Sequence, residues 1–244
     1  MEISILIFYF LLMLVAFLYA CVGHGGASGY LALMAFFSYT PETMRPTALL
    51  LNIFVSLIAF FQYYRSGYFR WKIFWPFAVT SIPAAYVGGH ITIHSEIYKP
   101  MLGILLLFPV IRLAGFRFTN SSTNKSPYKI AALLIGAVIG LLSGIIGIGG
   151  GIILSPVILL LHWANMKETA AVSALFIFVN SIAGIAGLFT NSFEFRQEMV
   201  IMVAIAFVGG LAGSYFGAKY FQNIFLRKLL AVVLLIASVK LIFT

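Results

Sequence analysis

Charge is scarce in this chain, and aspartate is missing altogether. Of the 244 residues only 9% are charged, and all six acidic residues are glutamates at the termini or in predicted connections. The apolar stretches therefore lack the buried carboxylate that usually binds protons or sodium inside a membrane. No group of His, Cys, Asp or Glu has metal-ligand spacing, so we expect neither a metal nor a cofactor. The single cysteine, Cys21, excludes an internal disulfide.

Apolar residues dominate what remains. They make up 62% of the chain, and the mean hydropathy is +1.08, which leaves too little polar surface for a water-soluble globule. The long uncharged runs match the length of membrane-spanning helices, whereas a β-barrel would alternate polar and apolar residues. The net charge of +9 comes from basic residues in short connections, so it indicates membrane orientation and no nucleic-acid binding. Glu2 precedes the first apolar run, which we therefore expect to be retained as a membrane segment and not cleaved as a signal.

Ten apolar segments fall into two sets of five, and the second segment of each set is too short to span. We predict an all-α polytopic membrane protein with a first membrane repeat at residues 1–113, a cytoplasmic linker at 114–128 and a second membrane repeat at 129–244. The segments are Ile3–Val22, Ser28–Ser38, Pro46–Tyr64, Ile73–Ile93, Met101–Ile111, Ile130–Ile146, Ile152–His162, Ala170–Phe189, Met199–Phe216 and Leu229–Phe243.

The two sets are an internal duplication. The segment GHGGASGYLALM from Gly23 aligns with GIGGGIILSPVI from Gly147, and Glu42-Thr43 aligns with Glu168-Thr169. If each short segment returns to its starting side, eleven of the fifteen basic residues lie on one face, against nine if it crosses. We therefore predict two inverted repeats, each with a broken, re-entrant helical hairpin, and both termini outside the cytoplasm.

The glycine-rich breaks are the predicted substrate site. As hairpin tips entering from opposite sides, they would meet near mid-membrane and direct free N–H groups and positive helix ends at one point, which favours an anion. Hydroxyl and amide side chains on neighbouring segments complete the set. The candidate substrate-binding residues are Gly23, His24, Gly25, Gly26, Ser28, Asn52, Gly147, Gly149, Gly150, Gly151, Ser155, Ser173 and Asn180.

Each candidate also has a structural interpretation. His24 is as well explained by a buried structural histidine as by a ligand, because Ile148 occupies the matching place. The ladders Gly136–Gly140–Gly144 and Gly209–Gly213–Gly217 indicate helix packing. Arg45, at the outer end of a span, is interpreted either as an interfacial anchor or as a vestibule charge that attracts anions.

The residues resemble those of the sulfite exporter TauE/SafE family, also called the four-toluene-sulfonate uptake permease group. The resemblance rests on both glycine-rich breaks, Ser155-Pro156 and the run Glu168-Thr169-Ala170-Ala171-Val172-Ser173. It implies transport of sulfur-containing anions such as sulfite, sulfonates or sulfoacetate across a bacterial inner membrane. The first half departs from the usual pattern at His24, at Gly29-Tyr30 and at Ala32, where the family has proline.

Two other functions compete with a transporter that works by alternating access. An anion channel would use the same opposed tips to line a pore. A rhomboid-like intramembrane serine protease is suggested by Gly26-Ala27-Ser28-Gly29, with His90 or His94 as base, but Ile152 replaces Ser28 in the duplicate. We expect a non-enzymatic transporter of a small anion, for which export is the simpler direction against a cytoplasm-negative potential. The sequence leaves homo-oligomerisation open.

Overall fold

A computed structural model describes residues 2–21, 24–113, 128–190, 196–219 and 224–243. Within these ranges every regular element is an α-helix, which confirms the predicted fold class. The predicted linker at 114–128 lies, except for Tyr128, outside the described residues. The helices are α1 (Glu2–Cys21), α2 (Ala27–Phe36), α3 (Pro41–Arg65), α4 (Trp71–His90), α5 (Ser95–Leu113), α6 (Lys129–Ile146), α7 (Gly151–Leu160), α8 (Met166–Phe189), α9 (Gln197–Lys219) and α10 (Ile224–Phe243).

The helices correspond to the ten predicted segments, but α3, α5 and α10 begin about five residues earlier than predicted. Helices α2 and α7 have ten residues each, so they are too short to span, as predicted. Helix α3 begins at Pro41 and carries Pro46 inside it, whereas the sequence predicted a start at Pro46. Pro41 occupies the first helical position, where a missing N–H costs little. Pro46 is the sixth residue, and the helix continues through it although the Glu42 carbonyl loses its usual N–H donor.

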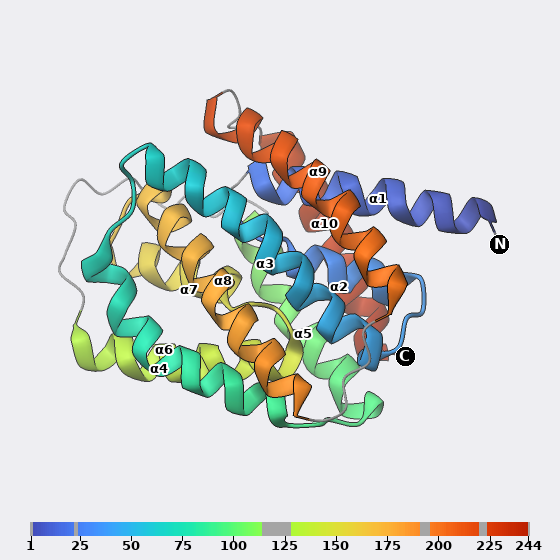
Figure 1. Ribbon diagram of the computed structural model, residues 1–244, viewed down its shortest axis with the longest axis horizontal. Coiled ribbons are helices and arrows are strands. Elements are labelled where there is room, and N and C mark those ends of the chain that lie inside the picture. Colours follow the sequence, from blue (N-terminus) through green and yellow to red (C-terminus); the bar gives the residue numbers. More distant parts are fainter. Residues whose placement is uncertain (1, 22–23, 114–127, 191–195, 220–223, 244) are drawn as a thin grey trace.

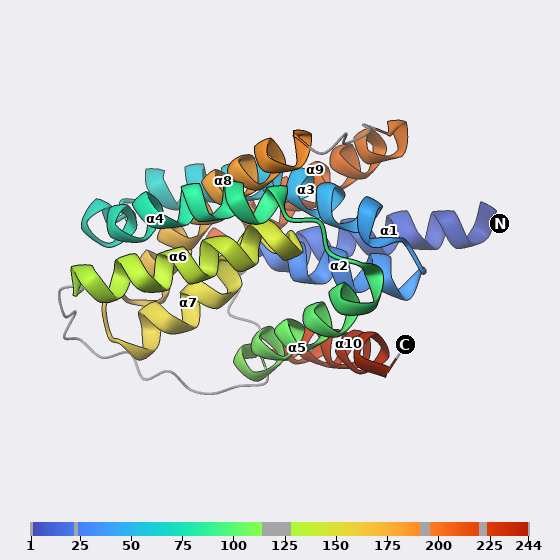
Figure 2. The same ribbon diagram turned by 90° about the horizontal axis from the view of Figure 1, so that it is seen from below.

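Each helix pair named here joins a helix of the first set to a helix of the second. Helix α1 lies along α9 and α6 lies along α4, while α3 packs against α8 and α5 against α10. Figure 2 shows α1 and α6 running in opposite directions, and Figure 1 shows both termini at the same end of the molecule. This pairing between the sets is the packing expected of two related halves. Their sidedness relative to a bilayer stays a prediction.

Glycines allow the paired helices to approach closely. A β-carbon at Gly136 would lie 2.6 Å from the carbonyl oxygen of Phe77 on α4, and one at Gly140 or Gly144 would clash with α4 backbone. Gly209 and Gly213 of α9 meet the α1 backbone in the same way. The packing role predicted for these glycines is confirmed; the surroundings of Gly217 lie outside the described residues.

The outer surface of the helices is apolar. Large hydrophobic side chains such as Ile3, Val138 and Val208 are exposed, which in water would be an aggregation hazard and in lipid is ordinary. Five of the described helices, α1, α3, α6, α8 and α9, are long and apolar enough to cross a membrane. Polar side chains such as Asn52, Ser173 and Asn180 are instead fully buried. The polar groups therefore concentrate where the halves meet.

Candidate functional site

Both glycine-rich breaks are non-helical turns that end in left-handed backbone. Gly26, at the N-cap of α2, has φ 93°, and Gly150, at the N-cap of α7, has φ 75°. Gly147 and Gly149 also have positive φ, a conformation that glycine adopts without the steric cost of a side chain. Both N-cap residues are glycines and have no side chain that could accept a hydrogen bond. The first N–H groups of α2 and α7 therefore lack the side-chain acceptor found at most helix starts.

The two breaks converge on one asparagine and one isoleucine. A β-carbon at Gly25 would lie 2.7 Å from Asn52 Oδ1 and 3.0 Å from Ile177 Cγ2. A β-carbon at Gly149 would lie 2.5 Å from Asn52 Nδ2 and 2.9 Å from the same Ile177 carbon. Asn52 belongs to α3 and Ile177 to α8, so the tips of both breaks meet where these helices pack together. Gly23, the first predicted residue of the site, lies outside the described residues.

Four buried polar groups around the breaks have no hydrogen-bond partner in the described part of the chain: Asn52 Oδ1, Tyr30 OH, Ser143 Oγ and Ser181 Oγ. Tyr30 OH lies 2.7 Å from a β-carbon position on Gly26, and Ser181 Oγ lies 3.1 Å from one on Gly149. Ser143 borders Gly150 through its own β-carbon. Four other buried groups in the described residues also lack a partner: Ser56, Ser81, Thr169 and Asn180 Oδ1. The four at the breaks are distinguished by lying beside two helix starts, where they could bind a ligand or ordered water.

A short hydrogen-bonded chain links the first break to the second half. His24 Nε2 lies 3.0 Å from Ser155 Oγ, which lies 2.7 Å from Ser173 Oγ. The Ser155 hydroxyl donates to the Gly151 carbonyl oxygen at 2.8 Å. Because a hydroxyl has one hydrogen, His24 Nε2–H and the Ser173 hydroxyl donate to Ser155. Three predicted site residues are thus brought together across the two halves.

Two predicted site residues have other partners. The Ser28 hydroxyl pairs with Tyr19 OH at 2.8 Å, and Asn180 Nδ2 donates to the Phe176 carbonyl oxygen within its own helix. No described hydrogen bond joins Ser28 to His90 or His94, and His90 Nδ1 pairs with Thr190 Oγ1. The structure therefore does not form the catalytic dyad required by the protease alternative.

Arg45 is a buried cation that holds two helix ends, and both of its predicted roles are wrong. The residue is 7% exposed. Its guanidinium donates to the carbonyl oxygens of Gly144 at 2.9 Å, Ile91 at 2.8 Å, Gly88 at 2.6 Å and Gly89 at 2.7 Å. These are carbonyls at the C-terminal ends of α4 and α6, where a cation is favoured by the helix dipole. Neither a vestibule charge nor an interfacial anchor would be enclosed in this way.

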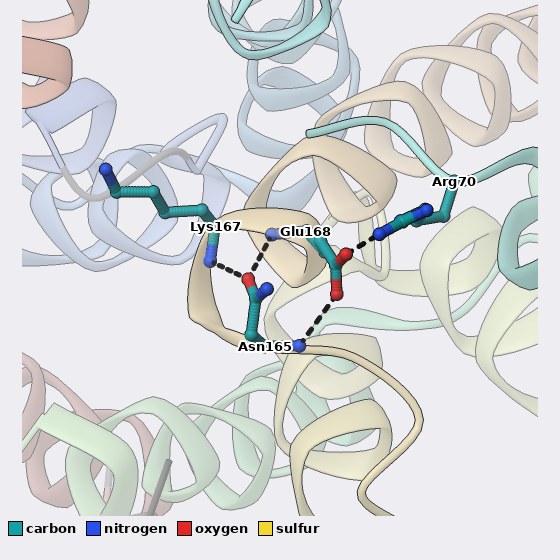
Figure 3. Close-up of polar contacts among 4 residues, drawn as sticks. All are labelled: Arg70, Asn165, Lys167 and Glu168. Atoms are coloured by element: carbon teal, nitrogen blue, oxygen red, sulfur yellow. Dashed lines mark hydrogen bonds and ion pairs between the residues drawn. The ribbon is translucent and has the colours of Figure 1, made fainter. Parts of the chain in front are cut away.

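An ion pair joins the halves at the start of α8. Arg70 Nε lies 2.7 Å from Glu168 Oε1, and Glu168 Oε2 accepts from the backbone N–H of Asn165 at 3.1 Å. Asn165 Oδ1 in turn accepts from the N–H groups of Lys167 and Glu168 (Figure 3). This capping box fixes the carboxylate that Arg70 meets. Glu168 therefore lies inside a helix and is buried, although the sequence placed it in a connection.

Tyr30, Ser143 and Ile177 were missed by the sequence analysis. Tyr30 carries the only phenol in α2, opposite Leu154 in the duplicated segment, and that difference was the available signal. Ser143 directly precedes Gly144, the last member of the glycine ladder in α6. Ile177 gave no signal, because an isoleucine in an apolar helix is the expected residue.

Comparison with known proteins decides the family. The family model for the sulfite exporter TauE/SafE matches residues 8–241. The chain belongs to the sulfite exporter TauE/SafE family. Relatives of this TauE/SafE protein include "Probable membrane transporter protein y4hK" of Sinorhizobium fredii, 36% identical over 93% of this chain and 94% of the relative. No solved structure matches the chain.

More distant relatives carry the same description. One from Methanocaldococcus jannaschii, named as a probable membrane transporter protein, is 26% identical over 80% of this chain and 77% of its own length. YdhB of Bacillus subtilis, named likewise, is 26% identical over 82% of this chain and 83% of its own length. Together with the apolar helices, the family assignment makes this TauE/SafE protein a membrane transporter.

Proposed function

We propose that this transporter moves small sulfur-containing anions, such as sulfite, sulfonates or sulfoacetate, and binds them where the two glycine-rich breaks converge. The observation that carries the proposal is the meeting of Gly25 and Gly149 at Asn52, surrounded by buried polar groups without partners. The family name supplies the substrate class. Two features of the geometry favour an anion in particular.

The first reason is the direction of the backbone dipoles. Helices α2 and α7 both begin at this point, and neither has a side-chain cap. Their free N–H groups and positive ends favour negative charge by about 0.3–1 kcal/mol per helix end, and by more where water is excluded. The second reason is the absence of opposing charge, because no acidic side chain contacts the breaks in the described part of the chain. The oriented dipoles act beside the buried Arg45, whose Cγ lies 3.2 Å from a β-carbon position on Gly147 and whose guanidinium is bonded to backbone carbonyls.

Alternating access is the mechanism we propose, and we expect an ion pair between the halves to form at each face in turn. Arg70 and Glu168 form such an ion pair. The duplication matches Arg70 with Arg196 and Glu168 with Glu42, yet within the described residues Arg196 and Glu42 are both exposed and form no ion pair with each other. The matched ion pair is thus formed at one face only, while at the other face a hydrogen bond between His90 and Thr190 joins the halves. Contacts that differ between the two faces are expected of halves that rock against each other.

We place the protein in a bacterial inner membrane with both termini outside the cytoplasm. In that orientation the Arg70–Glu168 ion pair lies at the cytoplasmic face, with most of the basic connections. A cytoplasm-negative potential disfavours anion entry by about 2.3 kcal/mol per charge per 100 mV, so unassisted transport runs outward. The proposed partners are the lipid bilayer and the small anion, with no nucleic acid, and the oligomeric state is left open.

Flux through purified protein in liposomes tests the proposal. Sulfite, thiosulfate and sulfoacetate are compared with lactate, chloride and acetate, with protein-free liposomes as the control. We expect saturable flux confined to the sulfur-containing anions, because a binding site must reload in each cycle. Equal, non-saturating flux of every anion would favour the channel alternative. Flux of none of them would refute the proposed substrate class.

A further inference from the structure

The two breaks share Asn52 and Ile177 but differ in the chemistry around the glycine that caps each helix. The glycines of the first break are contacted by polar atoms, Asn52 Oδ1 at Gly25 and Tyr30 OH at Gly26. At the second break, Gly149 also meets polar atoms, with Asn52 Nδ2 at 2.5 Å from a β-carbon position. Gly150, the N-cap of α7, is instead covered by Ile139 Cγ2 at 2.8 Å and Phe176 Cε1 at 2.9 Å. The start of α7 is therefore shielded by hydrocarbon, while the start of α2 faces polar groups. A charged group of the substrate is more stable beside the start of α2 than beside the start of α7.

Tyr30 is built into the start of α2. Its ring is fully buried, and its hydroxyl lies 2.7 Å from a β-carbon position on Gly26, the N-cap of the helix. No described group accepts from that hydroxyl or donates to it. A buried phenol normally has a partner, and at a helix start with no side-chain cap an anion would accept from both the hydroxyl and the free backbone N–H groups.

Asn52 contributes a hydrogen-bond acceptor, where Tyr30 contributes a donor. Its Nδ2 donates to the Ile148 carbonyl oxygen at 3.2 Å, which fixes the orientation of the amide, since a flipped side chain would set two oxygens against each other. Oδ1 is therefore directed at Gly25 as an acceptor, and it has no donor. A fully deprotonated oxyanion would be repelled by this oxygen, whereas an O–H group would satisfy it.

We propose that the first break is the anion-binding half of the site and selects a singly protonated oxyanion, such as hydrogensulfite, over the dianion. The Tyr30 hydroxyl and the first N–H groups of α2 donate to the charged oxygens, and Asn52 Oδ1 accepts from the substrate O–H. Tyr30 is thereby a specificity-determining residue. This inference rests on the proposed function, because it names the protonation state of a substrate of that class.

The wild-type protein provides a test that needs no variant. Saturation curves for sulfite flux into liposomes are measured at slightly acidic and slightly alkaline pH, with methanesulfonate as a competing inhibitor. Methanesulfonate is a single anion at both pH values and has no O–H. We expect the KM for total sulfite to rise with pH as hydrogensulfite is lost. The inhibition constant of methanesulfonate should stay constant and be about tenfold weaker than the KM expressed as hydrogensulfite, the loss expected for one hydrogen bond.

Methanesulfonate also serves as the control for protein groups near the site that change their own charge with pH. His24 lies in the first break, and Tyr19 and Cys21 lie at the end of α1 beside it; Arg45 and Tyr98 hold the end of α6. A change in the charge of any of them would alter the binding of methanesulfonate as well as that of sulfite. A pH effect confined to sulfite therefore reports the protonation of the substrate.

The Tyr30→Phe variant tests the donor. It removes only the hydroxyl and should weaken both anions about tenfold. Ser238→Ala is the control, since it removes a buried hydroxyl that donates to the Gly103 carbonyl oxygen between α10 and α5; both constants should stay within about twofold. A KM for sulfite that is independent of pH, or unchanged constants in Tyr30→Phe, would overturn the inference. Absence of saturable flux of any sulfur anion by the wild-type protein would instead refute the proposed function.

Discussion

Replacement of Arg45 by methionine should unfold the junction of α3, α4 and α6. The guanidinium donates four hydrogen bonds to backbone carbonyls, one on α6 and three at the end of α4 and just beyond it. Charge-assisted hydrogen bonds contribute about 1.5–3 kcal/mol each, but groups in one network are not additive. Replacement leaves buried carbonyl oxygens without these donors, at about 1–3 kcal/mol for each group left unsatisfied, and we expect a total loss of about 4 kcal/mol.

Thermal unfolding of the detergent-purified protein measures this loss. For a chain of this size 1 kcal/mol corresponds to about 2–4 °C, so Arg45→Met should lower the apparent Tm by about 10 °C. Arg45→Lys keeps the charge but replaces the planar fork by one nitrogen, and should lose about half as much. Arg65→Met is the matched control, because Arg65 is the exposed arginine at the other end of α3. Its apparent Tm should change by no more than about 2 °C.

The alternative role of Arg45 gives the opposite result. A vestibule charge acts on the approach of the anion, so its removal would raise KM and weaken the dependence of flux on salt while leaving the melting temperature unchanged. If Arg45→Met melts within about 2 °C of the wild type, the assignment of Arg45 to the helix ends is refuted.

Two further predictions concern contacts between the halves. Arg70→Gln removes the ion pair with Glu168 of α8 and should increase hydrogen–deuterium exchange in the loop between α3 and α4. Arg196→Gln should leave exchange in that loop unchanged. Equal increases in both variants would contradict the difference between the two matched pairs. Gly140→Leu places a side chain against the Ser81 backbone and should destabilise the protein by at least about 1–3 kcal/mol, measured as loss of monodisperse protein. Val138→Leu, on the exposed side of the same helix, is the control and should be recovered at wild-type yield.

The sequence by itself determined the class of the protein and its repeated plan. Composition and run lengths required lipid as the main solvent, since no folding pattern hides so many apolar residues in water. The match of Gly23–Met34 with Gly147–Ile158 predicted two related halves with short second helices. Glycines spaced four apart predicted that α6 and α9 would each pack closely against another helix. Each of these inferences depends on local composition or on comparison of the chain with itself, both of which are visible without the fold.

Only the tertiary structure decided which residues meet. The role of Arg45 depends on carbonyls 43 to 99 positions away, and a side chain at the start of one span gives no sign of the helix ends it will reach. Asn52 joins both breaks because α3 packs on α8, and Tyr30 matters because its hydroxyl returns to the glycine that caps its own helix. Periodicity tells which face of a helix is apolar, but the partner of a buried polar group is set by packing between distant segments.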